Sequence, residues 1–258
     1  MIPYQKTSSC SDNSYYYFLS RLALVICIAF SVGCTPAKEE ANEEVRLVGE
    51  MKNIMWKGQL QGNIYLDSIA NKNLLNGLGP LDSLSGEILI LDGKSYISRV
   101  LTDTTMEVKE NFGARAPFFA YAPNAAWITE DLPDSVQTLK QLERFLSERS
   151  QATQNPFLFK VSGTVEEATI HVVNLPRGTK VSSPEEAHLG RTFYSLKNED
   201  VDLVGFYSKN HKTIFTHHDT FLHIHLINSK RDKMGHLDDI QFKKKGVKLH
   251  LPASMGSK

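Results

Sequence analysis

Alternation of apolar and polar positions dominates the chain beyond residue 46 and predicts a strand-rich protein. Residues 86–101 combine an Ile/Leu run, the turn pair Asp92-Gly93 and a second alternating run, which is the pattern of a β-hairpin. Five later stretches follow the strand pattern as well: 157–163, 168–174, 201–208, 220–228 and 236–242. No internal repeat or low-complexity tract interrupts this pattern.

One segment, residues 134–149, has helical periodicity instead. Asp134 or Ser135 can cap it. Its apolar stripe consists of Val136, Leu139, Leu142 and Leu146. Strands, a helix and then strands again predict an α+β fold of two packed mixed or antiparallel β-sheet halves joined through the helix. We place the N-terminal half at 47–152 and the C-terminal half at 153–258.

The first 46 residues carry a different pattern. Arg21 precedes a 12-residue apolar run, shorter than the roughly 20 residues of a membrane-spanning helix. Ser31-Val32-Gly33-Cys34 resembles a bacterial lipobox, which implies a signal peptide over 1–33 and lipid attachment at Cys34. A plain N-terminal anchor or an uncleaved signal is the alternative. Residues 34–46 are polar and acidic and predict a flexible tether.

Composition narrows the class of protein. The 258 residues carry 29 basic and 29 acidic side chains, and this balance argues against nucleic acid as a partner. A hydrophobic content of 41% indicates a folded chain rather than a disordered one. All three cysteines lie in the first 34 residues, so the folded part has neither a disulfide framework nor a cysteine nucleophile.

All nine histidines, in contrast, lie at or after His171. Because side chains alternate along a strand, His223 and His225 point to the same face. A hairpin through the charged segment that follows would bring His236 beside them. Three imidazoles with a fourth position left open form a catalytic zinc site.

Other interpretations of the histidines stay open at this point. A lone strand histidine is more often a half-buried structural residue than a ligand, and a water-facing His-x-His pair is ordinary. The neighbouring pair His217-His218 would face opposite sides of a strand. Four more histidines have no spacing argument and are expected at the surface: His171, His188, His211 and His250.

Several motifs in one order along both halves resemble the α-acetolactate decarboxylase family. In the first half these are Asn76-Gly77-Leu78-Gly79, Leu84-Ser85-Gly86-Glu87 and Ala116-Pro117-Phe118-Phe119. In the second half they are Gly205-Phe206, Phe221-Leu222-His223-Ile224-His225 and Gly235-His236. The resemblance covers roughly residues 47–252.

The resemblance implies roles for particular residues. His223, His225 and His236 would hold zinc or another divalent transition metal, and Glu87 would stand near it as the family's glutamate. The family's active-site arginine corresponds to Lys160, which keeps the charge but loses the planar fork that grips a carboxylate. The family's C-terminal glutamate has no counterpart, since the last acidic residue is Asp239.

The activity implied is decarboxylation of 2-acetolactate to acetoin, with Lys160 holding the substrate carboxylate and Glu87 relaying a proton. The implied partner is a small anionic keto or hydroxy acid, and family habit favours a homodimer. Lipidation would place the protein in the bacterial cell envelope. Two alternatives are a metal-retaining relative without turnover and a metal-dependent enzyme for another small keto or hydroxy acid.

Overall fold

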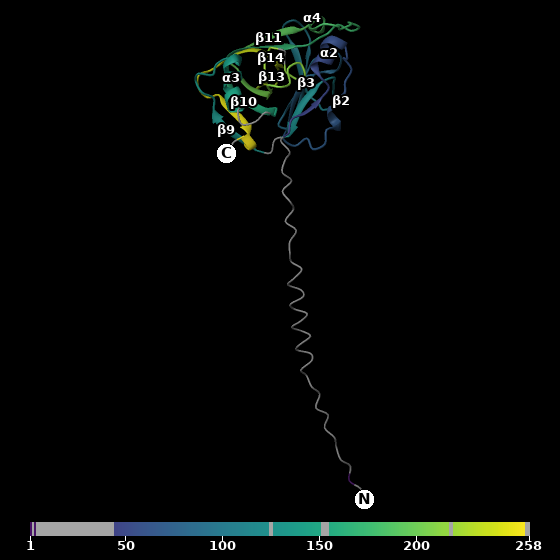
Figure 1. Cartoon of the computed structure of the whole chain (residues 1–258), viewed down its shortest axis with the longest axis vertical. Coiled ribbons are helices and arrows are strands. Elements are labelled where there is room, and N and C mark those ends of the chain that lie inside the picture. The colour runs from purple at the N-terminus through teal and green to yellow at the C-terminus, as the bar shows by residue number, and fades with distance from the viewer. Residues whose placement is uncertain (2, 4–43, 124–125, 151–154, 217–218, 256–258) are drawn as a thin grey trace. The chain divides into compact units, whose positions relative to one another are not determined.

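The computed structural model describes residues 44–123, 126–150, 155–216 and 219–255, together with Met1 and Pro3. The chain divides into two units, Met1–Glu40 and Ala41–Lys258, and all helices and strands described below belong to the second (Figure 1). Apart from Met1 and Pro3, the predicted signal peptide falls outside the described residues, and so do Cys34, His217 and His218.

The first sheet has six antiparallel strands in the order β1-β8-β3-β4-β5-β6. Its strands are Arg46–Val48 (β1), Leu75–Pro80 (β3), Glu87–Leu91 (β4), Lys94–Val100 (β5), Met106–Glu110 (β6) and Phe119–Pro123 (β8). The hairpin predicted over 86–101 is present as β4 and β5. Asp92 and Gly93 both have positive φ, 46° and 84°, as a tight two-residue hairpin turn requires.

The second sheet has seven strands built around one long strand, β10. Its strands are Trp127–Asp131 (β9), Phe157–Val172 (β10), Thr192–Lys197 (β11), Asp200–Tyr207 (β12), Leu222–Asn228 (β13), Met234–Phe242 (β14) and Lys248–Pro252 (β15). β10 pairs with β12 along its first half and with β14 along its second, while β13 pairs with both β12 and β14. The four strands therefore close on themselves. Two further short strands, Ile64–Tyr65 (β2) and Arg115–Ala116 (β7), pair with each other.

The α-helices are few and short: Met51–Lys57 (α2), Leu139–Arg149 (α3) and Pro184–Ala187 (α4). α3 begins later than predicted, because Thr138 rather than Asp134 or Ser135 caps it. The Thr138 hydroxyl accepts from the Gln141 backbone N–H and the Gln141 side chain accepts in return, which is a capping box. Among the described helices, none is long and apolar enough to cross a membrane.

The two sheets pack against each other through a shared hydrophobic layer. Leu78 and Leu89 of the first sheet belong to the same buried cluster as Val204 and Phe206 of the second. The opposite face of the closed strands forms another cluster, which Leu142 and Leu146 of α3 complete. The predicted α+β class is thus confirmed, with antiparallel pairing between all the described strands.

The chain passes from the first sheet to the second before it reaches α3. β9 precedes α3 in the chain and pairs with β15 at the edge of the second sheet.

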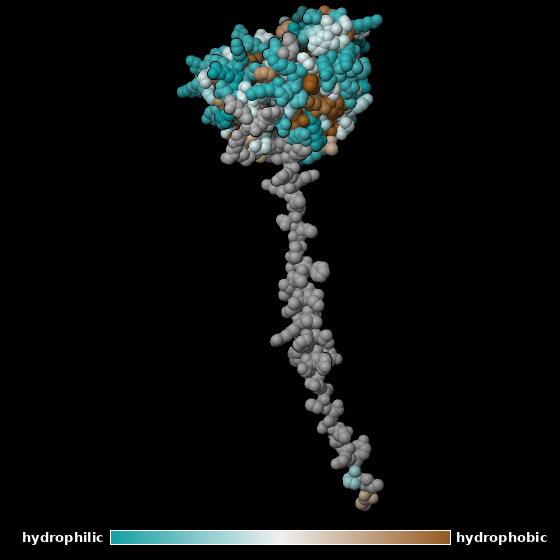
Figure 2. All heavy atoms as spheres, viewed as in Figure 1, coloured by the Kyte–Doolittle hydropathy of each residue, from teal (hydrophilic) through white to brown (hydrophobic). Residues whose placement is uncertain are grey.

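On the face seen in Figure 2 the surface is mostly hydrophilic, with hydrophobic residues gathered in limited areas. Large apolar side chains that are exposed include Trp56, Tyr65, Leu74, Leu189 and Phe193.

Candidate metal centre

The strand register aligns the histidines in one row across the second sheet. β13 pairs with β14 so that His225 lies opposite His236, and β14 pairs with β10 so that His236 lies opposite His171. His223 lies two residues before His225 and shares its face. The predicted hairpin is therefore present and brings His236 back beside the first two histidines.

The rings of these three histidines have the spacing of a shared ion. Their centroids are 5.2 Å apart for His223 and His225, 5.1 Å for His223 and His236, and 5.7 Å for His225 and His236. Three imidazoles on one tetrahedral zinc ion, with Zn–N distances of about 2.0–2.1 Å, have ring centres roughly 5 Å apart. The donor set is thus compatible with a zinc-type ion.

Neighbouring groups fix the orientation of the His223 ring. Its Nδ1 donates to the Phe215 carbonyl at 2.8 Å, which assigns the proton to Nδ1 and the lone pair to Nε2. The Phe118 ring stacks on the His223 ring, with 5.7 Å between ring centroids and an interplanar angle of 9°. Metal-ligating histidines are commonly held in this way, by a hydrogen bond from the ring nitrogen that does not bind the ion.

A further pair, His171 and Asp238, lies beside the row. His171 is buried rather than at the surface as predicted, with 3% exposure. Its Nδ1 lies 2.8 Å from both carboxylate oxygens of Asp238, and its ring centroid is 4.7 Å from that of His236. Ligand atoms of His171, His236 and Asp238 all lie within 4.8 Å of one another, so this trio can also hold a metal ion.

Sequence reasoning missed His171 because its proximity to His236 depends on the pairing of β10 with β14, 65 residues further along. Asp238 had a usable signal. It stands two residues after His236 on the same strand, the same spacing that relates His223 to His225. Among the described residues, the histidines outside the row are His188, His211 and His250, and all three are partly buried.

Glu87 lies at the start of β4 and faces the row from the first sheet. Its side chain is buried, with Oε2 3.7 Å from Nε2 of His225 and Oε1 accepting the Val173 N–H at 3.2 Å. Burial raises the pKa of this carboxyl well above its ordinary value, the Val173 N–H opposes that rise, and the charge of Asp238 adds to it. The structure therefore brings Glu87 together with the three predicted ligands.

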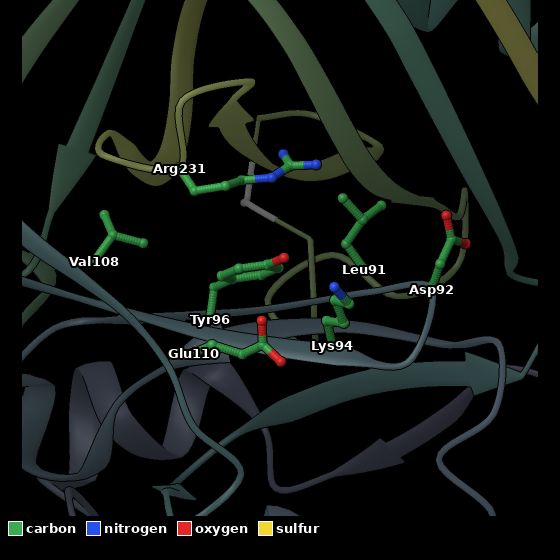
Figure 3. A pocket seen from close by; sticks show the side chains of 7 residues that line it. All are labelled: Leu91, Asp92, Lys94, Tyr96, Val108, Glu110 and Arg231. Atoms are coloured by element: carbon green, nitrogen blue, oxygen red, sulfur yellow. The ribbon is translucent and has the colours of Figure 1, made fainter.

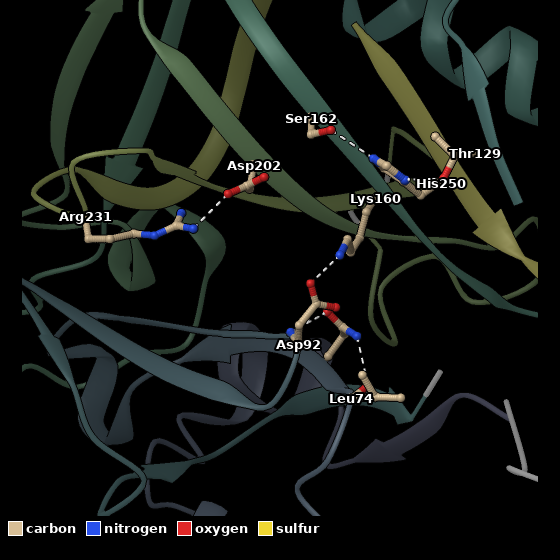
Figure 4. Close-up of polar contacts among 9 residues, drawn as sticks. Leu74, Asp92, Thr129, Lys160, Ser162, Asp202, Arg231 and His250 are labelled. Carbon is tan, nitrogen blue, oxygen red and sulfur yellow. Dashed lines mark hydrogen bonds and ion pairs between the residues drawn. The ribbon is translucent and has the colours of Figure 1, made fainter. Parts of the chain in front are cut away.

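Lys160 joins the two sheets. Its ammonium pairs with Asp92 in the β4–β5 turn (Figure 4). It also stands over the Trp127 ring, 4.9 Å from the centroid. Asp92 and Glu87 are five residues apart, which is roughly 16 Å along a strand. By register, Lys160 lies opposite Val204 on β12, and Val204 lies opposite His225 on β13, so Lys160 is two strands from the histidines while its ammonium is engaged by Asp92. Its role as the carboxylate-holding cation stays a prediction.

His250 belongs to the same region as Lys160 and has a structural environment. Its two ring nitrogens lie 2.9 Å from the hydroxyls of Thr129 and Ser162 (Figure 4). Burial, together with the positive charge of Lys160, lowers the pKa of this imidazole.

The histidine centre and the groove beside the β4–β5 turn are separate cavities. A cavity of about 40 Å³ between the sheets is lined by Glu87, His171, His223 and His236 among apolar side chains. A groove of about 610 Å³ lies beside the β4–β5 turn, where Arg231 stands over the Tyr96 ring at 5.6 Å (Figure 3). Arg231 also pairs with Asp202 (Figure 4). None of the histidines that the structure describes lines that groove.

Comparisons with known proteins agree with the motifs. The family model described as alpha-acetolactate decarboxylase matches residues 49–255. The fold is similar to crystal structures of the acetolactate decarboxylases from Bacillus subtilis strain 168 and subspecies spizizenii, with TM-scores of 0.66 and 0.67 at 20% identity. Each match covers 81% of this chain, and it covers 84% of the first structure and 85% of the second.

A third similar structure is a Staphylococcus aureus protein of unknown function, described as similar to alpha-acetolactate decarboxylase. It is 17% identical, with a TM-score of 0.66 over 80% of this chain and 84% of that one. The search of curated proteins gave no match. At these identities the structural likeness shows the fold, while the family model covers nearly the whole described region.

Proposed function

The chain belongs to the α-acetolactate decarboxylase family, and on this premise we propose that it converts 2-acetolactate to acetoin and carbon dioxide. One observation carries the proposal. The buried Glu87 carboxyl lies close to three histidine side chains between the two sheets. A carboxyl group beside a nitrogen-rich donor set is suited to a reaction that builds and then protonates an enolate.

His223, His225 and His236 are the residues we assign to hold the metal, and three imidazoles favour zinc or another divalent transition ion. When bound, such an ion supplies a Lewis acid that stabilises negative charge on the substrate's ketone and hydroxyl oxygens. His171 and Asp238 border the same position and share His236 with a second possible ligand set.

Glu87 is assigned to the proton transfer. Loss of carbon dioxide leaves the electrons of the broken C–C bond in an enediolate, which needs one proton on carbon to become acetoin. Oε1 of Glu87 accepts the Val173 N–H, so Oε2, the oxygen that faces His225, is the one that would hold the transferred proton. Apolar neighbours of this cavity, among them Met51, Ile54 and Phe118, exclude water from the transfer.

The purified protein provides the direct test. Bound metal is measured by elemental analysis, and acetoin formation is assayed from racemic 2-acetolactate. We expect about one ion per chain and turnover that stops when the ion is chelated. No acetoin from fully loaded protein would overturn the activity and would favour a metal-retaining protein without turnover, or an enzyme for another small keto or hydroxy acid.

We also propose that the chain is lipidated at Cys34 and held in the cell envelope. The support is the sequence alone, namely the short apolar run after Arg21 and the lipobox-like Ser31-Val32-Gly33-Cys34. Mass spectrometry of the mature N-terminus checks this. An intact residue 1–33 segment on the mature protein, or an unmodified Cys34 thiol, would contradict it.

A further inference from the structure

A loop that follows β12, residues 211–216, contacts the His223 ring. We call it the 211–216 loop. Its Phe215 carbonyl accepts the Nδ1–H of His223 at 2.8 Å. The Phe215 side chain is buried, and its ring centroid lies 6.4 Å from that of Phe206 and 5.3 Å from that of His211. Because this carbonyl orients a metal-ligating ring, whatever holds the loop bears on the metal centre.

The 211–216 loop is folded on itself in an unusual conformation. The His211 carbonyl accepts the N–H groups of Ile214 and Phe215, both at 3.1 Å. Thr213 has a φ of 64°, a left-handed conformation that a β-branched residue rarely adopts. Such a conformation persists only where the surrounding contacts enforce it.

The first two residues of α2 supply these contacts. The Met51 N–H donates to the Ile214 carbonyl and the Lys52 N–H donates to the Thr213 carbonyl, both at 2.8 Å. N–H groups in the first turn of a helix have no acceptor inside that helix, so they can donate to another element. Three successive carbonyls of the loop thus have fixed donors, two on α2 and one on the His223 ring.

The same stretch of chain supports the second contact of the ring. β1 ends at Val48 and α2 begins at Met51. β1 pairs with β8, and Phe118, the residue before β8, stacks on the His223 ring. Phe118 and Phe215 belong to the same buried cluster as Met51. The segment from β1 to α2 therefore supports both groups that hold this ring.

We propose that α2 positions the metal centre: the Met51 and Lys52 N–H groups hold the 211–216 loop so that the Phe215 carbonyl fixes the His223 ring. This rests on the proposed function, in which His223 is a metal ligand. The effect is reciprocal, because a contact that favours metal binding is itself strengthened by the metal. Metal binding therefore holds α2 more firmly on the loop.

Hydrogen exchange of the wild type, measured for single N–H groups by NMR, tests the reciprocal effect. Metal loading should slow exchange at Met51 and Lys52 at least about fivefold, the lower end of the usual coupling between two sites. The Gln141 N–H at the start of α3, which the Thr138 hydroxyl accepts, is the reference. Its exchange should slow by less than twofold.

Lys52→Pro removes one of the two donors. Proline is tolerated in the first turn of a helix and Lys52 is exposed, so α2 itself should persist. In the metal-free variant, the protected Nδ1–H signal of His223 should disappear from the NMR spectrum. Metal affinity should fall at least about tenfold, since loss of a partner that orients a ligand typically costs 10–100-fold.

Lys140→Pro is the matched control. Lys140 is exposed and is the second residue of α3, as Lys52 is of α2, and among the described residues its N–H donates to no other element. Lys52→Ala keeps the backbone donor but removes the ion pair with Glu50. Both variants should retain the His223 signal and a metal affinity within twofold of the wild type.

Equal slowing of exchange at Gln141 and in α2 would overturn the proposal, and so would a retained His223 signal with unchanged metal affinity in Lys52→Pro. The exchange measurement uses the wild type and stands even if Lys52→Pro does not fold. The His223 signal is measured without metal, and no readout needs turnover. A protein that binds no ion or forms no acetoin would therefore refute the proposed function, while the metal-free spectra still test the positioning by α2.

Discussion

At the scale of single residues, burial decides the protonation of Glu87. Its pKa in the folded protein lies above the value in the unfolded chain, chiefly because the carboxylate would lose its hydration. Between these two pKa values the folded state holds a proton that the unfolded state has released. Stability contributed by this group is therefore fully present below the unfolded pKa and is lost as pH rises through the folded pKa.

Glu87→Gln should remove this pH dependence. For metal-free protein, we expect the free energy of unfolding of the wild type to fall relative to the variant as pH rises above about 4.5. The slope of this difference should approach ~1.4 kcal/mol per pH unit where only the unfolded carboxyl is ionised. Urea denaturation across pH 4.5–8 measures it, and parallel stability curves for the two proteins would contradict it.

A second prediction at this scale concerns His223, whose Nε2 carries the lone pair. His223→Ala should reduce metal affinity by at least about 100-fold, since loss of even an outer-shell partner typically costs 10–100-fold. His250→Ala is the control, because His250 bonds Thr129 and Ser162 instead. Elemental analysis after dialysis measures the metal content of both variants. Retention of the ion by folded His223→Ala would show the ligand assignment to be wrong.

At the scale of elements, the strength of a local signal decided what the sequence could predict. The β4–β5 hairpin was predictable because Asp92-Gly93 supplies the two positive φ angles that the turn needs. β10 was predicted as two strands, 157–163 and 168–174, because Glu166 and Glu167 interrupt the apolar pattern. In the fold both are exposed positions within one strand, beside a register shift in the pairing with β14.

In the candidate site too, the residues with a local sequence signal were predictable and those placed by long-range pairing were not. His223, His225 and His236 were predictable because two lie at strand spacing and the third follows a short turn. His171 was not, since it reaches the row through a long-range register that no short segment encodes. The position of Lys160 was also unpredictable, because its partner Asp92 is on the other sheet.

Gly205 on β12 gives a prediction for the packing of two strands. A Cβ added there would lie 2.2 Å from the Phe159 ring on β10. Gly205→Ala should therefore destabilise the protein by about 1–3 kcal/mol through overpacking. Gly113→Ala, where the nearest atom is in the side chain of Asn111 at 3.1 Å, is the control and should change stability by less than about 0.5 kcal/mol. Equal stability of both variants in urea would refute the close contact.

The start of α3 gives a prediction about a single cap. Thr138→Ala removes the hydroxyl that accepts the Gln141 N–H and should cost about 1 kcal/mol, while Thr138→Ser should retain most of the stability. Urea denaturation compares the two substitutions. A loss that Ser does not restore would show that the capping hydrogen bond is not responsible.

At the scale of the whole molecule, the candidate metal centre is part of the interface between the two sheets. Glu87 comes from the first sheet and the histidines from the second, while Lys160 and Asp92 join the same two sheets at the other end of β4. A ligand that binds only the folded arrangement stabilises it by RT ln(1 + [L]/Kd).

Removal of the metal should therefore lower the melting temperature. At a thousandfold excess of free ion over Kd, the loss corresponds to about 4 kcal/mol. Scanning calorimetry with and without chelator measures it. His223→Ala should melt at the same temperature in both conditions, and a wild type indifferent to the chelator would contradict the coupling.

The closed path of β10 has a consequence for how the molecule is made. β10 needs β14, one of the last strands of the chain, to pair along its second half. His236 lies on that strand, so a nascent chain has its first sheet translated long before its metal ligands are complete. Because domains generally fold as they emerge and long-range pairings form late, the closed strands and the histidine row should assemble only after β14 has emerged. Metal loading would then follow the synthesis of β14 and depend on the ions in whichever compartment these strands close.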